Sequence, residues 1–191
     1  MSLPPNAIDA IRRLNRLGQD IKNLFVGRDQ VVDLMTLALV CREHMLLLGP
    51  PGTGKSELVL RFARGVQARP FHYLLTRFTE PAELFGPLDL RAFEAGHYRI
   101  ITERMLPKAE VAFLDEVFQA SSSILNTLLT VIHERLFHNG PNADQVDLIS
   151  LFAASNDLPE DANLGAFSDR FALRAQVDPI PDQALGDLVD K

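Results

Sequence analysis

The stretch GPPGTGKS, from Gly49 to Ser56, matches the phosphate-loop pattern at every position. Gly52 and Gly54 allow backbone conformations that a side chain would block, so that successive N–H groups can converge on an anion. Lys55 adds a positive charge for the outer phosphates, and the hydroxyl of Ser56 can ligate Mg²⁺. The stretch therefore predicts a site for the phosphates of a nucleotide.

The surroundings of this loop support the prediction. An apolar run over 45–48 precedes it, and an amphipathic pattern over 55–66 follows it. A short apolar run that ends in turn residues is typical of a strand buried on both faces. The following helix would direct its partially positive N-terminus at a bound phosphate. The alternative, a chance glycine turn between a strand and a helix, is disfavoured by this context.

Segments of the same two kinds alternate along the rest of the chain. The expected strands cover 45–48, 71–75, 111–114, 148–154 and 173–177. The expected helices cover 8–24 with a break at Gly18, 31–40, 55–66 and a segment that begins at 121–123. Between them we expect a loop-rich region with short helical pieces over 79–96, a short strand or hairpin arm over 96–102, and a hairpin turn at 139–142. The alternation predicts an α/β fold whose parallel sheet is covered on both faces.

Two carboxylates end one of the expected strands. Asp115 and Glu116 directly follow the apolar run over 111–114, and ligands of parallel sheets bind at the carboxyl edge of the strands. Asp115 would hold Mg²⁺ through water as the acidic partner of Ser56, and Glu116 would orient and deprotonate an attacking water. An ordinary acidic pair on a solvated loop is the alternative, and the phosphate loop makes it the weaker one.

An amide ends the next expected strand. Asn156 follows the strand over 148–154 and would reach the same edge, where it can hydrogen-bond an attacking water and a γ-phosphate oxygen. The more ordinary role of an asparagine in this position is to form a turn.

A basic residue precedes the last expected strand. Arg170 lies in the segment Asp169-Arg170-Phe171. It is either a surface charge or a partner of Asp169, or, if subunits form a ring, a residue that enters the neighbouring site and stabilises charge in the transition state.

Composition limits the class of protein. The 191 residues suit one folded domain, and 19 basic against 25 acidic side chains give a net charge of −6, which argues against general attraction to nucleic acid. A single cysteine, Cys41, excludes an internal disulfide, and we expect it to be buried at the end of an apolar helix. Arg12, Arg13, Arg16 and Lys22 form a modest basic face that keeps a DNA-associated motor as a minor alternative.

No membrane span is expected. The longest apolar stretch, 31–48, is interrupted by Asp33 and by Arg42-Glu43-His44, whereas a span needs about 20 apolar residues in succession. The first six residues lack the features of a signal peptide. We therefore expect a soluble, cytoplasmic protein.

The motifs together resemble those of AAA+ ATPases. GPPGTGKS, FLDE at 113–116, ASN at 154–156 and DRF at 169–171 occur in the order and at spacings similar to that family. The segments 78–87 and 113–137 resemble the MoxR branch, and within it the similarity is closest to the regulatory ATPase variant A (RavA) subgroup. The resemblance covers about 24–177.

The resemblance implies a fold and a set of site residues. It implies a P-loop NTPase αβα sandwich with a five-stranded parallel sheet of order 5-1-4-3-2, ATP or ADP with Mg²⁺ as cofactors, and a nucleotide-dependent, hexameric ring. Asn156 would be sensor 1, Arg170 a finger that acts in trans, and the segment Phe25, Val26 and Gly27 would contact adenine. Further family features would be an insertion near 96–106 and a hairpin over 134–146. The nucleotide-binding loop comprises Gly49, Pro50, Pro51, Gly52, Thr53, Gly54, Lys55, Ser56 and Glu57.

The resemblance also implies a domain organisation and an activity. We expect residues 1–181 to form the AAA+ core and 182–191 to begin a helical lid that is truncated or missing, as in a fragment. The implied function is Mg²⁺-dependent ATP hydrolysis that remodels or matures protein complexes, often with a von Willebrand A-domain partner. A nucleotide-gated interaction module with little turnover is the alternative. A GTPase is disfavoured because no Asn-Lys-x-Asp segment occurs.

Overall fold

A five-stranded parallel sheet forms the centre of the molecule. The computed structural model describes residues 4–158 and 162–179. The spatial order of the strands is β2 (Pro70–Leu74), β3 (Val111–Asp115), β6 (Ser150–Ser155), β1 (Met45–Leu48) and β7 (Leu173–Gln176), and every neighbouring pair is parallel. Counted along the chain, these are the second, third, fourth, first and fifth strands, so the predicted order 5-1-4-3-2 is confirmed.

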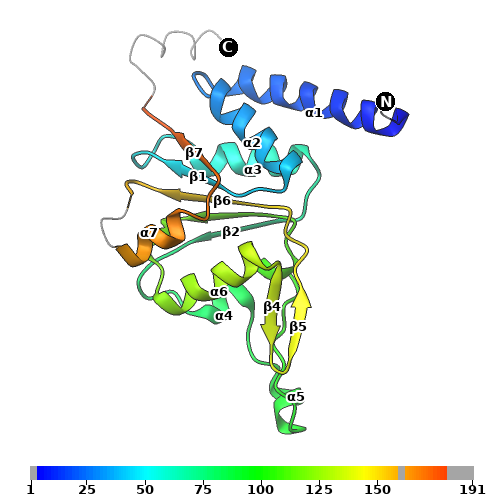
Figure 1. The fold of residues 1–191 in the computed structure, drawn as a ribbon, viewed down its shortest axis with the longest axis vertical. Coiled ribbons are helices and arrows are strands. Elements are labelled where there is room, and N and C mark those ends of the chain that lie inside the picture. Colours follow the sequence, from blue (N-terminus) through cyan, green and yellow to red (C-terminus); the bar gives the residue numbers. More distant parts are fainter. Residues whose placement is uncertain (1–3, 159–161, 180–191) are drawn as a thin grey trace.

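Helices cover both faces of this sheet (Figure 1). One face carries α1 (Pro5–Leu24), α2 (Asp29–Cys41) and α3 (Lys55–Gly65). The other carries α4 (Pro81–Phe85), α6 (Ser122–His133) and α7 (Ala162–Ser168), together with the 3₁₀ turns η1 (Leu106–Lys108) and η2 (Val117–Gln119). The predicted αβα sandwich is therefore present, and the predicted strands and longer helices lie within a few residues of their expected positions.

Alternation along the strands divides the core into two layers. In β1, Met45 and Leu47 belong to the layer under α1, α2 and α3, whereas Leu46 belongs to the layer under α6. The same alternation places Phe113 with the first layer and Leu114 with the second. A strand buried on both faces must be apolar throughout, which explains the unbroken apolar runs in the sequence.

Two sequence expectations about the helices are wrong. Gly18 does not break α1, which continues through it; the glycine is buried against Val32 of α2, so that helix packing outweighs its low helix propensity. Nearby, Leu17 packs directly over Gly65 of α3, where a Cβ would lie 2.3 Å from its side chain. Cys41 is exposed rather than buried, because α2 ends there and Arg42 turns the chain in the left-handed conformation.

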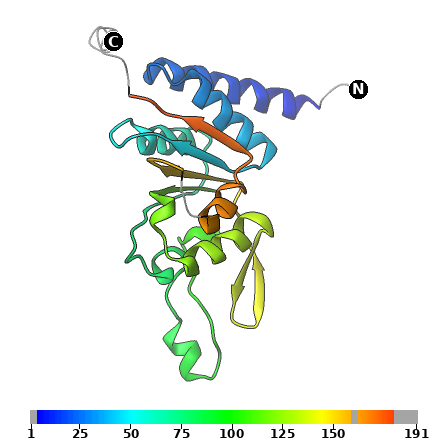
Figure 2. The ribbon, with the colours of Figure 1, turned by 60° about the vertical axis from the view of Figure 1, so that its left-hand side comes forward.

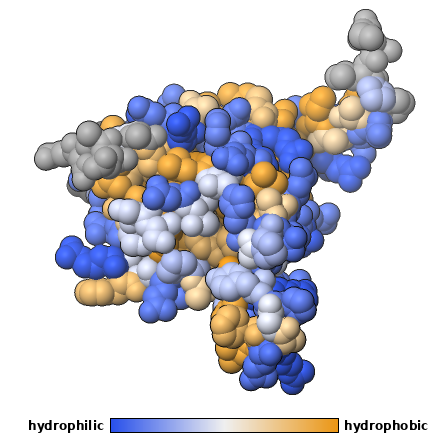
Figure 3. All heavy atoms as spheres, turned by 60° about the horizontal axis from the view of Figure 1, so that its bottom comes forward, coloured by the Kyte–Doolittle hydropathy of each residue, from blue (hydrophilic) through white to orange (hydrophobic). Residues whose placement is uncertain are grey.

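A two-stranded ribbon and a short helix project from one end of the molecule (Figures 1 and 2). The ribbon pairs β4 (Leu136–Asn139) with β5 (Asn142–Gln145) and contains the predicted hairpin turn. The short helix is α5 (Leu90–Glu94), and the arm expected over 96–102 is reduced to one bridge between Leu88 and Ile100. The projection thus begins before residue 96. Figure 3 shows apolar side chains exposed on the projection. Phe93 of α5 is 56% exposed.

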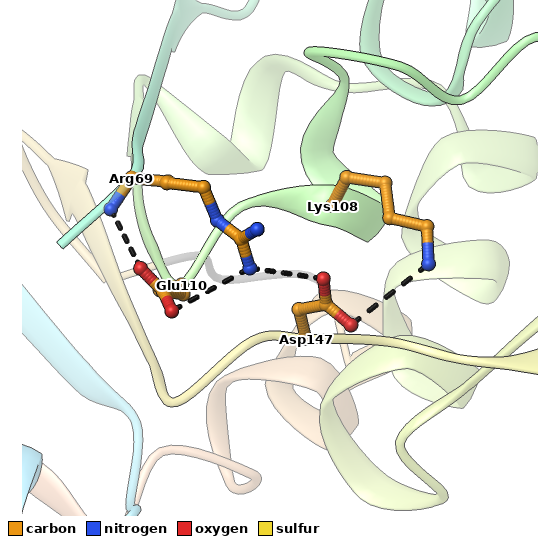
Figure 4. Close-up of polar contacts among 4 residues, drawn as sticks. All are labelled: Arg69, Lys108, Glu110 and Asp147. Atoms are coloured by element: carbon orange, nitrogen blue, oxygen red, sulfur yellow. Dashed lines mark hydrogen bonds and ion pairs between the residues drawn. The ribbon is translucent and has the colours of Figure 1, made fainter.

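Ion pairs hold the edge of the sheet where the strands begin. Arg69 precedes β2 and binds both Glu110, which precedes β3, and Asp147, with Nη2 to carboxylate distances of 3.5 and 3.0 Å. Lys108 lies 3.8 Å from the other oxygen of Asp147 (Figure 4). Exposed pairs of this kind contribute about 0–1 kcal/mol each, so this cluster links the starts of β2 and β3 but adds little to the stability.

None of the helices described over 4–158 and 162–179 has the length and apolar character that crossing a bilayer requires. The expected start of a lid at 182–191 lies outside the described residues.

A buried histidine beside β1 predicts a pH-dependent stability. The Nδ1 atom of His44 accepts the N–H of Leu151 at 3.0 Å, so its Nε2–H donates to the carbonyl of Ile132, also at 3.0 Å. Burial, reinforced by the nearby charge of Arg135, lowers the pKa of His44 from 6.5 to about 4. The unfolded chain therefore takes up a proton between these pH values while the folded protein does not, so stability falls as the pH falls.

We expect the free energy of unfolding to decrease by up to about 3 kcal/mol across this interval, because one pKa unit corresponds to about 1.4 kcal/mol. Urea denaturation at a series of pH values measures this decrease. The matched variant is His44→Asn, which removes the titrating group and should flatten the pH dependence. An equal slope in both proteins contradicts the prediction.

Candidate functional site

Three strands bring the predicted site residues to one edge of the sheet. The phosphate loop follows β1, Asp115 ends β3 and Asn156 follows β6. Leu48 is in register with Ser155, and β6 lies between β1 and β3. Because the strands are parallel, their carboxyl ends meet at this edge, where such sheets bind ligands.

The phosphate loop has the backbone freedom that its glycines predict. Gly52 and Gly54 both have φ of +80°, and nothing lies within 4 Å of the position of a Cβ at either one. At Gly49, by contrast, a Cβ would lie 2.2 Å from the carbonyl oxygen of Val177, so the loop begins in close contact with the end of β7. The loop then leads into α3, whose first residues are Lys55, Ser56 and the exposed Glu57.

Lys55 is buried, at 6% exposure, and its ammonium is held by the loop itself. Nζ donates to the carbonyl oxygens of Gly49 at 2.6 Å and Pro50 at 2.9 Å. Burial lowers the pKa of Lys55, the carboxylates of Asp115 and Glu116 oppose this shift, and the charge of Arg28 adds to it. The ammonium and the two acids are therefore close enough to interact. A cation inside a loop of this shape is suited to an anionic ligand.

Ser56 and Asp115 come together across the site. The hydroxyl of Ser56 donates to Oδ2 of Asp115 at 3.2 Å. A hydroxyl and a carboxylate oxygen are hard donors of the kind that Mg²⁺ prefers, and Mg²⁺ usually takes only one or two protein ligands besides phosphate and water. The pair therefore fits Mg²⁺ bound with a phosphate. No group of three or more His, Cys, Asp or Glu side chains able to hold a metal occurs among residues 4–158 and 162–179.

Glu116 leaves the strand with an unusual backbone. Its φ is +52°, in the left-handed region that residues with a Cβ rarely adopt, and its N–H donates to Oδ1 of Asp115 at 3.1 Å. The side chain is half-buried. Strained backbone at such a position is common in functional sites.

Asn156 and Arg170 lie in different places. Asn156 is exposed directly after β6, on the edge that carries the phosphate loop. Arg170 is also exposed, but it lines a hollow of about 230 Å³ together with Arg42 and His133, near the start of β1. Its possible partner Asp169 binds Arg174 at 3.0 Å instead. Asn156 therefore lies at the edge of the sheet where the strands end, as Lys55 does, whereas Arg170 lies at the opposite edge, where the strands begin.

The segment 25–28 borders the phosphate loop through a residue that the sequence analysis missed. Phe25 and Val26 are half-buried between α1 and α2, and Gly27 is exposed with φ of +70°. The next residue, Arg28, is 6% exposed, and its Nη2 donates to the carbonyl oxygen of Thr53 at 3.2 Å. The available signal was weak: a lone arginine between a glycine and an apolar helix is more often a surface charge.

Comparison with known proteins identifies relatives of the whole core. A family model for the MoxR domain in the MoxR-vWA-beta-propeller ternary systems matches residues 12–191. Two uncharacterised proteins of Methanocaldococcus jannaschii are each 43% identical, over 88% and 93% of this chain and 45% and 48% of their own lengths. The chaperone MoxR1 of Mycobacterium tuberculosis is 30% identical over 65% of this chain and 32% of its own. The chain thus spans about half the length or less of these relatives.

Solved structures share the fold. A crystal structure of a candidate ATPase from Cytophaga hutchinsonii has a TM-score of 0.75 and 16% identity, covering 94% of this chain and 55% of that one. The ADP complex of Hsp104 from S. cerevisiae has a TM-score of 0.66 and 15% identity, covering 94% of this chain and 38% of that one. The predicted P-loop NTPase sandwich is therefore confirmed.

Proposed function

The chain belongs to the MoxR domains of the MoxR-vWA-beta-propeller ternary systems, and from this premise we propose that it is the core of an AAA+ ATPase that binds ATP with Mg²⁺ and hydrolyses it. The hydrolysis would drive chaperone-like remodelling or maturation of protein complexes. One observation carries the proposal: Lys55, the pair Ser56–Asp115 and Glu116 meet at the carboxyl edge of the sheet, beside a loop open at Gly52 and Gly54.

Each residue at this edge has a separate role in the proposed hydrolysis. The N–H groups of the loop and the ammonium of Lys55 bind the phosphates, with Lys55 exchanging the carbonyls of Gly49 and Pro50 for phosphate oxygens. Ser56 and Asp115 would hold Mg²⁺, which supplies charge neutralisation on the phosphate oxygens. The carboxylate of Glu116 accepts a proton from the water that attacks the γ-phosphorus, and Asn156 orients that water as sensor 1.

A second subunit would complete the site. Arg170 lies at the opposite edge of the sheet from Lys55, so it suits the phosphates of a neighbouring subunit better than those of its own. A closed ring is the finite assembly in which every site receives an arginine from a neighbour, and for this ring we propose a nucleotide-dependent hexamer. In the transition state the guanidinium would stabilise charge on the transferred phosphoryl group.

Other parts of the proposal rest on the family alone. A von Willebrand A-domain partner is suggested by the family's own description, and protein clients, the cytoplasm as location and the RavA subgroup are further proposals. Phe25, Val26 and Gly27 would contact adenine, since their segment borders the loop through Arg28. We keep the division into a core at 1–181 and the start of a lid at 182–191 as part of the same proposal.

Removing the loop ammonium tests the nucleotide site. We expect Lys55→Ala to weaken binding of a fluorescent ATP analogue by about 100-fold, because charge-assisted hydrogen bonds contribute about 1.5–3 kcal/mol and Lys55 can give more than one. Fluorescence titration at several Mg²⁺ concentrations measures the dissociation constant. Arg61→Ala, which removes an exposed cation from the same helix, is the control and should bind like the wild type. Equal affinity in Lys55→Ala would place the nucleotide elsewhere.

A further inference from the structure

Arg28 connects three segments that are far apart in the sequence. It precedes α2, and its Nη2 donates both to the carbonyl oxygen of Thr53 in the phosphate loop, at 3.2 Å, and to that of Asp178 after β7, at 2.7 Å. The residue is buried, at 6% exposure. A buried guanidinium with two backbone acceptors is a fixed contact, since losing either one would leave a buried polar group unpaired.

The bond to Thr53 fixes the orientation of a peptide group. In a planar trans peptide, the carbonyl of one residue and the N–H of the next point in opposite directions. Arg28 holds the carbonyl of Thr53, so the N–H of Gly54 points away from the guanidinium. Gly54 has φ of +80° and immediately precedes α3, where N–H groups face a bound anion. Arg28 therefore acts on a group that phosphate binding would use.

The bond to Asp178 belongs to a second set of contacts between the loop and β7. The N–H of the preceding residue, Val177, donates to the carbonyl of Leu48 at 2.6 Å. The carbonyl oxygen of Val177 lies 2.2 Å from the position that a Cβ at Gly49 would take. The loop is thus joined to the chain leaving β7 both at its first residue and, through Arg28, at Thr53.

We propose that Arg28 is a positioning residue that keeps the phosphate loop in its anion-binding shape and couples it to the segment that leaves β7. The proposal rests on the proposed nucleotide function. A structural arginine of similar chemistry is present for comparison: Arg135 donates to the carbonyls of Leu148 and Ile149, near the opposite edge of the sheet. Both arginines thus donate to backbone carbonyls, but only Arg28 does so at the phosphate loop.

Titration calorimetry with ADP on the full chain compares four proteins. The wild type should bind ADP, and Arg28→Met should bind at least about 10-fold more weakly because the peptide at Thr53 is released. Arg28→Lys should stay within about threefold of the wild type, because both bonds come from a single nitrogen and an ammonium also carries several donors on one nitrogen. Arg135→Met should lower the unfolding midpoint yet keep the wild-type affinity. If Arg28→Met does not fold, Arg28→Gln takes its place, because its side chain ends two atoms short of Nη2 and cannot reach both carbonyls, and the same loss of at least about 10-fold is expected.

Hydrogen exchange on the nucleotide-free proteins gives a second readout. Arg28→Met should speed exchange in peptides covering 49–58 and 175–179 and leave 136–145 unchanged, whereas a general loss of stability would speed all three. Wild-type affinity for ADP in Arg28→Met, or uniform acceleration of exchange, overturns the role of Arg28 alone. A wild type that does not bind ADP overturns the proposed function as well, so the two failures are distinguishable.

Discussion

Glu116→Gln is expected to bind ATP as the wild type does and to hydrolyse it about 10²- to 10⁴-fold more slowly, the usual contribution of a general base. The amide keeps the size and hydrogen-bonding capacity of the side chain but is too weak a base to take the proton from the attacking water. Binding should be unaffected because, in the proposed mechanism, Lys55 and the loop bind the phosphates. In free energy, the loss corresponds to about 3–5 kcal/mol of transition-state stabilisation.

Phosphate release and nucleotide affinity must be measured on the same samples of this variant. Both are taken at protein concentrations at which the wild-type turnover per subunit has reached its plateau. Glu94→Gln, which neutralises an exposed carboxylate at the end of α5, is the control and should not change either quantity. Unaltered turnover in Glu116→Gln would remove Glu116 from its role, and lost affinity would make it a binding group.

The fold was predictable because its signals are local. The phosphate loop, the apolar strands and the acidic strand end each depend on neighbouring residues, and parallel pairing then fixes which ends meet. Gly18 was misjudged because a helix tolerates glycine when it lies against another helix, and that contact with Val32 is tertiary. Helix propensity alone favours a break at this position.

The site was predictable only in part, for the same reason. Lys55, Ser56, Asp115 and Glu116 belong to two short motifs, and the sheet brings these together. Arg28 belongs to neither motif. Its contacts are with the carbonyl groups of Thr53 and Asp178. Every residue has a backbone carbonyl, so the sequence does not indicate which ones accept a hydrogen bond from Arg28. Backbone acceptors of this kind can be found only once the chain has been folded.

Arg170→Ala is expected to retain nucleotide affinity and lose turnover by about 10³-fold, the lower range measured for arginine fingers supplied in trans. Arg170 stands at the edge of the sheet where the strands begin, whereas the phosphates would lie at the edge where they end. Arg170 therefore cannot act on the phosphates bound by its own subunit. If it acts on those of a neighbour, wild-type turnover per subunit should rise with protein concentration as rings form. Arg42→Ala, which removes a cation from the same hollow, should leave turnover within about threefold.

Mixing two inactive variants separates a role in trans from local damage. Lys55→Ala has an intact Arg170 but a defective phosphate loop, and Arg170→Ala has the reverse. At an interface where the first protein offers its arginine to the second, every required group is present, so the mixture should hydrolyse ATP although neither protein does so alone. A mixture that stays inactive while the two proteins co-assemble, or a wild-type turnover that is independent of concentration, would contradict action across the interface. In that case each site would contain all the groups it uses, and Arg170 would be a surface charge.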